Sequence, residues 1–359
     1  MSRAPLRVAV LGAGTVGREV VRALLAGDDR LRAVDGAAFE LVGVAVRDVD
    51  RARAAGIPGE LLTDAPAHLV AASDTDVIVE LMGGDEPAHT LVAAALSAGK
   101  AVVTANKHVI AHHGAALEAT ARRADAALRF EAAVGGGIPV LTPLASDLAA
   151  NHVTAVRGIV NGTTNYILTA MADEGRDYAE VLAAAQAAGY AEADPSGDVD
   201  GHDAVNKLVI LARLAFGGWI EPADVRTVAD DGPGAGRPGI TGIVAGDLAA
   251  ARERGGVIKL IAEARRDPDG GIEANVLPRV VDAASPFGRT DGVLNRIEID
   301  ADPVGTVAFS GPGAGGPATS SAVLGDLIAI ARGLGSTWAG LPPASGVSRI
   351  RAGGAGASR

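Results

Sequence analysis

The chain has 359 residues, 48% of them hydrophobic, and this length favours two domains over one. A formal net charge of −11 argues against nucleic acid as a partner, because polyanions would be repelled. There is no cysteine, so disulfides, cysteine-bound metals and a catalytic thiol are excluded. Neither a secretory signal nor an apolar run of about 18 residues is evident, which predicts a cytoplasmic protein without a membrane partner.

The first part of the chain alternates short apolar runs with alanine-rich helical stretches. This alternation predicts βαβ units on a parallel sheet, because short buried strands separated by helices need crossover connections. The expected elements are strands at 6–11, 39–46, 76–81 and 101–104, and helices at 15–26, 87–98 and 108–124.

The pattern changes after Phe130, where FEAAVGGGIPV predicts a shaped loop rather than a regular element. A glycine-rich turn at 311–316 then opens a last helix, which we expect to return to the first domain. Between them we expect helices at 140–150, from 161, at 178–188 and at 203–215, and strands at 153–160, 257–266, 272–281 and 293–301.

The sequence therefore predicts an α/β protein with two domains. A Rossmann-type dinucleotide-binding domain at 1–135 is completed by the return helix at about 311–335, and an α+β catalytic and dimerisation domain occupies 136–310. Residues 336–359 are rich in Gly, Ala, Ser and Pro without apolar periodicity, so we expect a disordered tail.

A dinucleotide fingerprint, Gly12-x-Gly14-x-x-Gly17, directly follows the first expected strand and opens the first helix. The three glycines permit a tight turn, close approach of a pyrophosphate and close helix–strand packing. A glycine-rich turn without a ligand is the alternative. The expected cofactor contacts in this turn are Gly12, Ala13, Gly14, Thr15, Val16 and Gly17.

The second expected strand ends in Arg47-Asp48, which bears on the choice of cofactor. An arginine here suits the 2′-phosphate of NADP, whereas an acidic residue suits the ribose hydroxyl of NAD. Arg47 comes first, so NADP is favoured. NAD stays possible if Arg47 is a solvated charge and Asp48 takes the ribose.

Several longer segments resemble the homoserine dehydrogenases. The segment 76–111 contains TANK, 161–168 reads NGTTNYIL, 189–212 reads GYAEADPSGDVDGHDAVNKLVILA, and 311–323 reads GPGAGGPATSSAV. The resemblance covers roughly residues 5–335. It implies NAD(P)-linked interconversion of L-homoserine and L-aspartate 4-semialdehyde, in threonine, methionine and isoleucine biosynthesis, by a homodimer.

The same resemblance implies roles for individual residues. Lys207 matches the family's proton donor, and Lys107 a lysine near the nicotinamide and substrate. Glu192, Asp198 and Asp203 match acidic residues that bind the substrate. Thr104 and Gly311 match positions beside the cofactor.

The resemblance also implies a monovalent cation, sodium or potassium. It would be held by backbone carbonyls at Glu131, Val134, Gly136 and Ile138. Many relatives carry a C-terminal regulatory ACT domain, and the tail of this chain is too short and too polar to form one, which puts feedback inhibition through such a module in doubt.

The residue types agree with this chemistry. Reduction of an aldehyde creates an alkoxide that a cation must stabilise and protonate, and a lysine whose pKa is lowered can do so. Lys107 and Lys207, approaching one site from different domains, would lower each other's pKa. Asp203 lies one helical turn before Lys207 and would orient it or take the substrate amine; a plain surface ion pair is the alternative.

Two metal interpretations compete for these segments. The run 196–207 places acidic residues as a calcium loop would, but Lys207 stands where that loop needs a bidentate glutamate, so calcium is rejected. His112 and His113 are adjacent and do not face one another on a helix, so we interpret them as surface residues. The acidic cluster at 192–203 suits a substrate ammonium instead.

Overall fold

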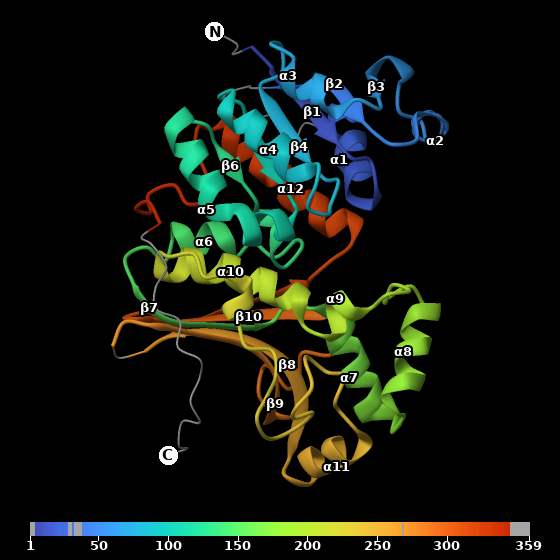
Figure 1. Ribbon diagram of the computed structural model, residues 1–359, viewed down its shortest axis with the longest axis vertical. Helices are drawn as coiled ribbons and strands as arrows, with labels where there is room; N and C mark the ends of the chain where they lie inside the picture. Colours follow the sequence, from blue (N-terminus) through green and yellow to red (C-terminus); the bar gives the residue numbers. More distant parts are fainter. Residues whose placement is uncertain (1–3, 28–30, 32–37, 268, 345–359) are drawn as a thin grey trace. The chain divides into compact units, whose positions relative to one another are not determined.

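The computed structural model describes residues 4–27, 31, 38–267 and 269–344 (Figure 1). The described residues divide into two compact units, one formed by residues up to 147 together with 314–343, and the other by residues 148–313. No helix among the described residues is long and apolar enough to cross a membrane.

The first unit is built on a parallel sheet with strand order β3-β2-β1-β4-β5-β6. Its central strands are almost free of polar side chains because helices cover both faces. The strands are β1 (Leu6–Leu11), β2 (Phe39–Ala45), β3 (Leu62–Thr63), β4 (Val77–Glu80), β5 (Ala101–Thr104) and β6 (Leu128–Arg129).

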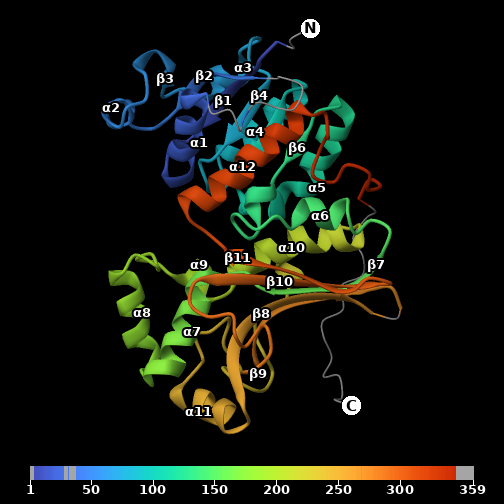
Figure 2. The ribbon, with the colours of Figure 1, turned by 180° about the vertical axis from the view of Figure 1, so that it is seen from behind.

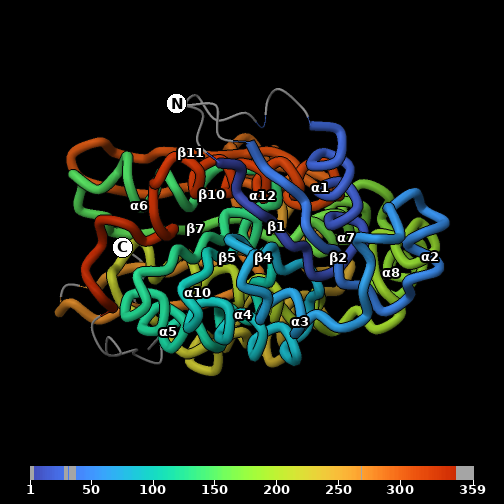
Figure 3. The backbone as a smooth tube through the Cα atoms, turned by 90° about the horizontal axis from the view of Figure 1, so that it is seen from above, coloured from blue at the N-terminus to red at the C-terminus, as the bar shows by residue number. Residues whose placement is uncertain are grey.

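Helices flank this sheet on both sides, as Figure 3 shows. One face carries α1 (Thr15–Ala26) and α12 (Gly316–Ala331), which contact each other although some 300 residues separate them along the chain. The other face carries α3 (Pro66–Ala71), α4 (Ala88–Ser97) and α5 (Lys107–Ala124), while α2 (Val49–Ala54) and the 3-10 turn η2 (Gly59–Leu61) connect β2 to β3. The predicted Rossmann-type architecture is confirmed.

The chain leaves the first unit through two short elements after β6. They are the 3-10 turn η3 (Glu131–Ala133) and α6 (Leu141–Ala145), with the glycine loop between them. The expected helix at 140–150 is thus shorter than predicted, and 146–150 form turns.

The second unit contains an antiparallel sheet with strand order β11-β10-β7-β8-β9 (Figure 2). Helix α10 packs on β7, β8 and β9, and α7 packs on β8 and β10. The strands are β7 (His152–Ile159), β8 (Gly256–Arg266), β9 (Ile272–Asp282), β10 (Leu294–Asp302) and β11 (Gly305–Pro312). The helical elements are α7 (Gly162–Glu174), α8 (Tyr178–Ala187), α9 (Ser196–Val199), α10 (His202–Phe216), η4 (Pro222–Asp224) and α11 (Ala245–Glu253).

Strand β11 was not expected from the sequence. It is an edge strand that pairs only with β10 among the described residues, and most of its side chains are exposed or half-exposed. Its sequence therefore lacks the buried hydrophobic run by which the other strands are recognised.

The expectation of a disordered tail from residue 336 is wrong for 336–344. Trp338 is 2% exposed and packs on Phe130 with ring centroids 5.5 Å apart. The Thr337 amide donates to the carbonyl of Leu128, and the Phe130 amide donates to the Thr337 hydroxyl. One tryptophan and a few hydrogen bonds hold this segment in place, and these contacts leave no periodic pattern of apolar residues in the sequence. Residues 345–359 of the predicted tail lie outside the described part.

Candidate active site

The glycine turn between β1 and α1 has little space for side chains. Gly12 has a φ of 101°, and a Cβ there would lie 2.6 Å from the carbonyl oxygen of Leu81. A Cβ at Gly17 would lie 2.0 Å from the Gly12 carbonyl oxygen. A Cβ at Gly14, in contrast, would meet nothing within 4 Å. Protein atoms therefore leave no room for a side chain at Gly12 or Gly17, whereas the space beside Gly14 is free for a pyrophosphate.

The first turn of α1 keeps its amides available. Its N-cap is Gly14, and no side chain caps the helix. The amides of a helix's first turn have no partner within the helix and carry the positive end of its dipole. These residues, with Ala13 beside them, fit the phosphates of a dinucleotide.

Two adjacent charged residues, Arg47 and Asp48, follow β2 and differ in their contacts. Asp48 is the N-cap of α2, and its Oδ1 accepts from the Arg51 amide at 2.9 Å. Arg47 is exposed at the carboxyl end of the strand. The aspartate thus already has a structural partner, whereas Arg47 is exposed to solvent.

A buried carboxylate that the sequence analysis missed organises the ends of β4 and β5. Glu80 is 0% exposed; its Oε2 accepts from the Thr104 hydroxyl at 2.5 Å, and its Oε1 accepts from the amides of Met82 and Gly83. The Thr104 hydroxyl in turn accepts from the Asn106 amide at 2.9 Å. A glutamate within the apolar run of β4 is the signal that could have revealed this network.

Asn106 connects two loops at this edge of the sheet. Its Oδ1 caps α5 by accepting from Val109, and its Nδ2 donates to the carbonyl of Gly84 at 2.8 Å. Lys107 is the first residue of α5 and is half-buried. The Glu80–Thr104–Asn106 chain therefore fixes where Lys107 begins its helix.

The loop predicted to hold a cation is shaped by Glu131. This residue is 6% exposed, and its carboxylate accepts from the amides of Val140, Leu141 and Thr142, each at 2.8 Å. The side chain is thus used to cap α6, which leaves only the main-chain carbonyl for a cation. Val134, Gly136 and Ile138 are buried in the loop, and Gly136 has a φ of 59°.

Asp326 of α12 connects the last helix to this loop. Arg129 Nε donates to Asp326 Oδ1 at 2.7 Å, and the Glu131 amide donates to Asp326 Oδ2 at 2.8 Å. Burial raises the pKa of Asp326 to about 6, against the opposing effect of the Arg129 guanidinium. The loop therefore depends on α12 for its position.

The second unit holds a buried lysine at the end of β7. Lys207, on α10, is 8% exposed; its Nζ donates to the carbonyl of Val160 at 2.6 Å and to Asp203 Oδ2 at 2.7 Å. The predicted shared face of Asp203 and Lys207 is present, and it is buried rather than on the surface. The i, i+4 spacing brings the two side chains together.

Asn161 is a member of this cluster that the sequence analysis did not single out. Its Nδ2 donates to Asp198 at 2.7 Å and to Asp203 at 2.8 Å, and its Oδ1 caps α7 by accepting from Thr164. It lies one residue beyond the end of β7 and opens NGTT, and this N-cap position was the available signal. Asn161, Asp198, Asp203 and Lys207 form the lysine–aspartate cluster.

Glu192 and Gly311 lie elsewhere in the second unit. Glu192 is exposed on the loop after α8, where its carbonyl accepts from Gln186 at 2.9 Å. Gly311 is in β11 opposite Asn295.

Three observations concern the segments that were considered as metal sites. No group of three or more histidine, aspartate or glutamate side chains in the described chain is arranged to hold a metal ion. The run 196–207 forms α9 and the start of α10 rather than a calcium loop. His112 is exposed, whereas His113 is half-buried, stacks on His89 and hydrogen bonds to Asp85 at 2.7 Å.

A Rossmann-type unit with an open glycine turn, in one chain with a buried lysine–aspartate cluster, defines the class as an NAD(P)-dependent oxidoreductase. Two family models match: homoserine dehydrogenase over residues 139–328, and the NAD binding domain of homoserine dehydrogenase over 12–131. The chain belongs to the homoserine dehydrogenase family.

Individual relatives agree along most of the chain. The homoserine dehydrogenase of Mycobacterium tuberculosis is 46% identical over 332 residues, 91% of this chain and 73% of the relative. That of Corynebacterium glutamicum is 44% identical, over 90% of this chain and 72% of the relative. The crystal structure of the Thiobacillus denitrificans enzyme matches with a TM-score of 0.89 and 36% identity, over 98% of this chain and 80% of that one.

A Gly14→Ala variant is expected to fold with unchanged thermal stability, because the added methyl meets no protein atom within 4 Å. Its affinity for NADPH should fall at least about tenfold, since the methyl enters the space that a pyrophosphate needs. Gly17→Ala should lose both stability and affinity. Calorimetric titration and thermal unfolding measure the two effects, with Gly325→Ala on α12 as the control; unchanged NADPH affinity in Gly14→Ala would contradict the assignment of the turn.

Proposed function

We propose that this chain interconverts L-homoserine and L-aspartate 4-semialdehyde with NADP as its preferred cofactor and Lys207 as the group that gives and takes the proton. The observation that carries this is the ammonium of Lys207, buried beside Asp203 at 2.7 Å and the Val160 carbonyl at 2.6 Å. A lysine held in this way is poised to donate a proton to a nearby oxygen.

Lys207 handles the proton of the reacting oxygen. In the direction of reduction, the Nζ–H bond breaks as the alkoxide oxygen of the product takes the proton, and Lys207 becomes a neutral amine. In the direction of oxidation, the neutral amine removes the hydroxyl proton of homoserine. Asp203 stabilises the charged form and orients it in both directions.

The other carboxylates of the cluster would bind the substrate ammonium. Asn161 donates to one oxygen of Asp198 and to one of Asp203, which holds both carboxylates in place. Asp198 is half-buried, and its Oδ2 has no partner among the described residues, so it can accept from the substrate. Glu192 is proposed as a further substrate ligand, from the resemblance of its motif to the family.

The nicotinamide, when bound, supplies or accepts the hydride. The residues proposed to hold the cofactor are Gly12–Gly17, Arg47, Thr104, Lys107 and Gly311. The support is the open glycine turn with uncapped amides and the fixed ends of β4 and β5. The structure of a hyperthermophilic archaeal homoserine dehydrogenase in complex with NADPH matches this chain with a TM-score of 0.74 and 26% identity, over 92% of this chain and 98% of that one.

Lys207→Ala should lower kcat by at least about 10²-fold, the low end for a general acid–base group. NADPH oxidation with L-aspartate 4-semialdehyde measures this, and NADPH affinity should not change. Lys259→Met is the matched control, because Lys259 is also a buried lysine of the second unit but binds Thr290 and Asp291 instead. An effect confined to KM would exclude Lys207 as the proton donor.

Arg47→Ala should raise the KM for NADPH by roughly 10- to 100-fold and leave that for NADH nearly unchanged, because only NADPH offers a 2′-phosphate to the guanidinium. Arg53→Ala is the control, since Arg53 is exposed nearby and pairs with Asp50. No loss with either cofactor would argue instead for the NAD interpretation, in which Arg47 is a solvated charge and Asp48 takes the ribose. Equal losses with both cofactors would contradict a contact between Arg47 and the 2′-phosphate.

We further propose that the carbonyls of Glu131, Val134, Gly136 and Ile138 hold sodium or potassium. The support is that positive φ at Gly135 and Gly136 turns the loop sharply, and that the Glu131 carboxylate is taken up by α6. Turnover in sodium or potassium chloride should exceed turnover in tetramethylammonium chloride of equal ionic strength. Equal rates in all three salts would remove the cation from the proposal.

A homodimer and a cytoplasmic biosynthetic role complete the proposal. On β7 and β10, Arg157 lies 3.4 Å from Glu298 and 3.1 Å from Asp300, so one sheet face carries both charge signs and can complement its own copy. Sedimentation equilibrium that finds only monomer would contradict the dimer. The role in threonine, methionine and isoleucine synthesis is proposed from the resemblance to the family.

A further inference from the structure

The segment after β4, Leu81–Gly84, is not among the residues proposed to hold the cofactor, yet it lies beside the glycine turn. Along the chain, β2 and β3 are added on one side of β1, and β4, β5 and β6 on its other side. In an open parallel sheet, ligands bind in the crevice at such a reversal, beyond the carboxyl ends of the two strands. The glycine turn follows β1 and Leu81–Gly84 follows β4, so the two segments border the same crevice.

These two segments contact each other directly. The Leu81 amide donates to the carbonyl of Leu11 at 2.8 Å. A Cβ at Gly12 would lie 2.6 Å from the Leu81 carbonyl oxygen and 3.0 Å from the Met82 nitrogen. The glycine turn therefore packs on the peptide that joins Leu81 and Met82, and a rotation of this peptide would displace the turn.

The segment after β4 also leaves its main chain accessible. Gly83 and Gly84 are exposed, each has a φ of 72°, and a Cβ at either would meet nothing within 4 Å. Gly14 in the glycine turn has the same open space. A ligand in the crevice can thus approach the main chain of both segments. Two successive glycines are conformationally permissive, however, so the segment needs a constraint from elsewhere to keep one shape.

Glu80 supplies that constraint. Its Oε1 accepts from the amides of Met82 at 2.7 Å and Gly83 at 3.3 Å. Its Oε2 accepts from the hydroxyl of Thr104, which is its partner in the parallel ladder. All three partners are donors, as a carboxylate buried away from water requires.

The far end of the segment is tied to the start of α5. The carbonyl of Gly84 accepts from Asn106 Nδ2 at 2.8 Å, and Asn106 caps the helix whose first residue is Lys107. Glu80 reaches the same cap through Thr104, whose hydroxyl accepts from the Asn106 amide. One carboxylate therefore acts both on the peptide that supports the glycine turn and on the cap of the helix that carries Lys107.

We propose that Glu80 is a positioning residue of the cofactor site, which holds Leu81–Gly84 against the glycine turn before NADPH binds. This inference rests on the proposed function, because NADPH is its ligand. The hydrogen bonds that Glu80 accepts matter more than its charge. A side chain of similar volume that accepts none leaves the amides of Met82 and Gly83 without an acceptor, and NADPH must then order the segment at a cost in affinity.

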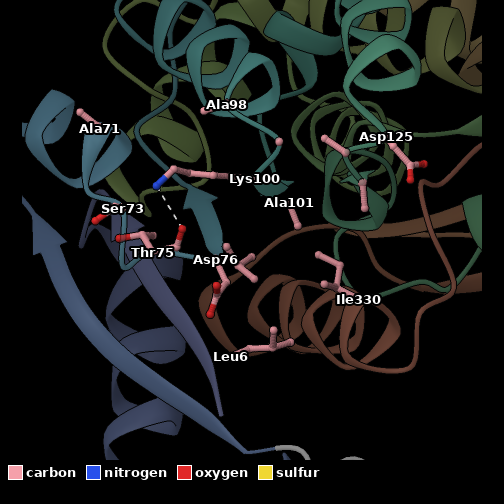
Figure 4. Close-up of a pocket in the computed structure, with 14 residues that line it drawn as sticks. Leu6, Ala71, Ser73, Thr75, Asp76, Ala98, Lys100, Ala101, Asp125 and Ile330 are labelled. Atoms are coloured by element: carbon pink, nitrogen blue, oxygen red, sulfur yellow. Dashed lines mark hydrogen bonds between the residues drawn. The ribbon is translucent and has the colours of Figure 1, made fainter. Parts of the chain in front are cut away.

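Lys100 offers a matched comparison at the opposite edge of the same two strands. It directly precedes β5, is buried, and donates through Nζ to the carbonyls of Ala72 and Thr75, beside a cavity of about 600 Å³ (Figure 4). The four residues of β4 span about 13 Å, which separates these contacts from those of Glu80. Both side chains bind main-chain groups next to β4 and β5, but only Glu80 is at the edge that carries the glycine turn.

Isothermal titration of the full chain with NADPH, together with thermal unfolding, tests the proposal. Glu80→Met should weaken NADPH binding at least about tenfold, whereas Lys100→Met should lower thermal stability and keep the parent's affinity within about twofold. Glu80→Gln should bind NADPH within about threefold of the parent, because its carboxamide oxygen can accept from both amides and its nitrogen can donate to the Thr104 hydroxyl.

Hydrogen exchange of the parent adds a measurement that holds even if Glu80→Met does not fold. The amides of Met82 and Gly83 should be protected before NADPH is added. The proposal is overturned if these amides become protected only with NADPH, or if Glu80→Met binds NADPH as the parent does. It is also overturned if Lys100→Met or Glu80→Gln loses as much affinity as Glu80→Met. All these outcomes leave the proposed function standing, whereas a parent chain that binds no NADPH would overturn both.

Discussion

A lysine ammonium withdrawn from water has to be surrounded by oxygen atoms, because an unpaired buried charge costs several kcal/mol. At Lys207 the oxygens come from the carbonyl of Val160 and the carboxylate of Asp203. Asn161 then binds that same carboxylate and caps α7. The end of β7, the start of α7 and the first turn of α10 are therefore fixed by one set of contacts, and the groups suited to chemistry also stabilise the fold.

Buried carboxylates play a parallel part in the first unit. Glu80 holds the amides that follow β4, and Glu131 holds those that open α6. In each case a negative side chain binds main-chain amides of a loop at an end of the sheet, so the loop keeps its shape without a large core of its own. Such loops are the ones that a Rossmann-type fold uses for ligands.

Much of this architecture follows from the sequence because the signals are local. Strand β1, the three glycines and α1 lie within 21 residues, and Asp203 and Lys207 are one helical turn apart. Asn161 could not be assigned in the same way, because its partners Asp198 and Asp203 are 37 and 42 residues away. The hydrogen bond from Thr104 to Glu80 and the packing of Trp338 on Phe130 likewise join distant segments. Both depend on tertiary structure that no local pattern encodes.

The position of α12 has a consequence for biosynthesis. The first unit is interrupted by the second and needs Gly316–Ala331 to cover α1 and to bring Asp326 to Arg129. Domains generally fold as units while the ribosome extends the chain. The inserted unit can complete its sheet at β11, whereas one sheet face of the outer unit stays only partly covered until translation has passed residue 331. The segment that emerges first is therefore among the last to reach its final packing.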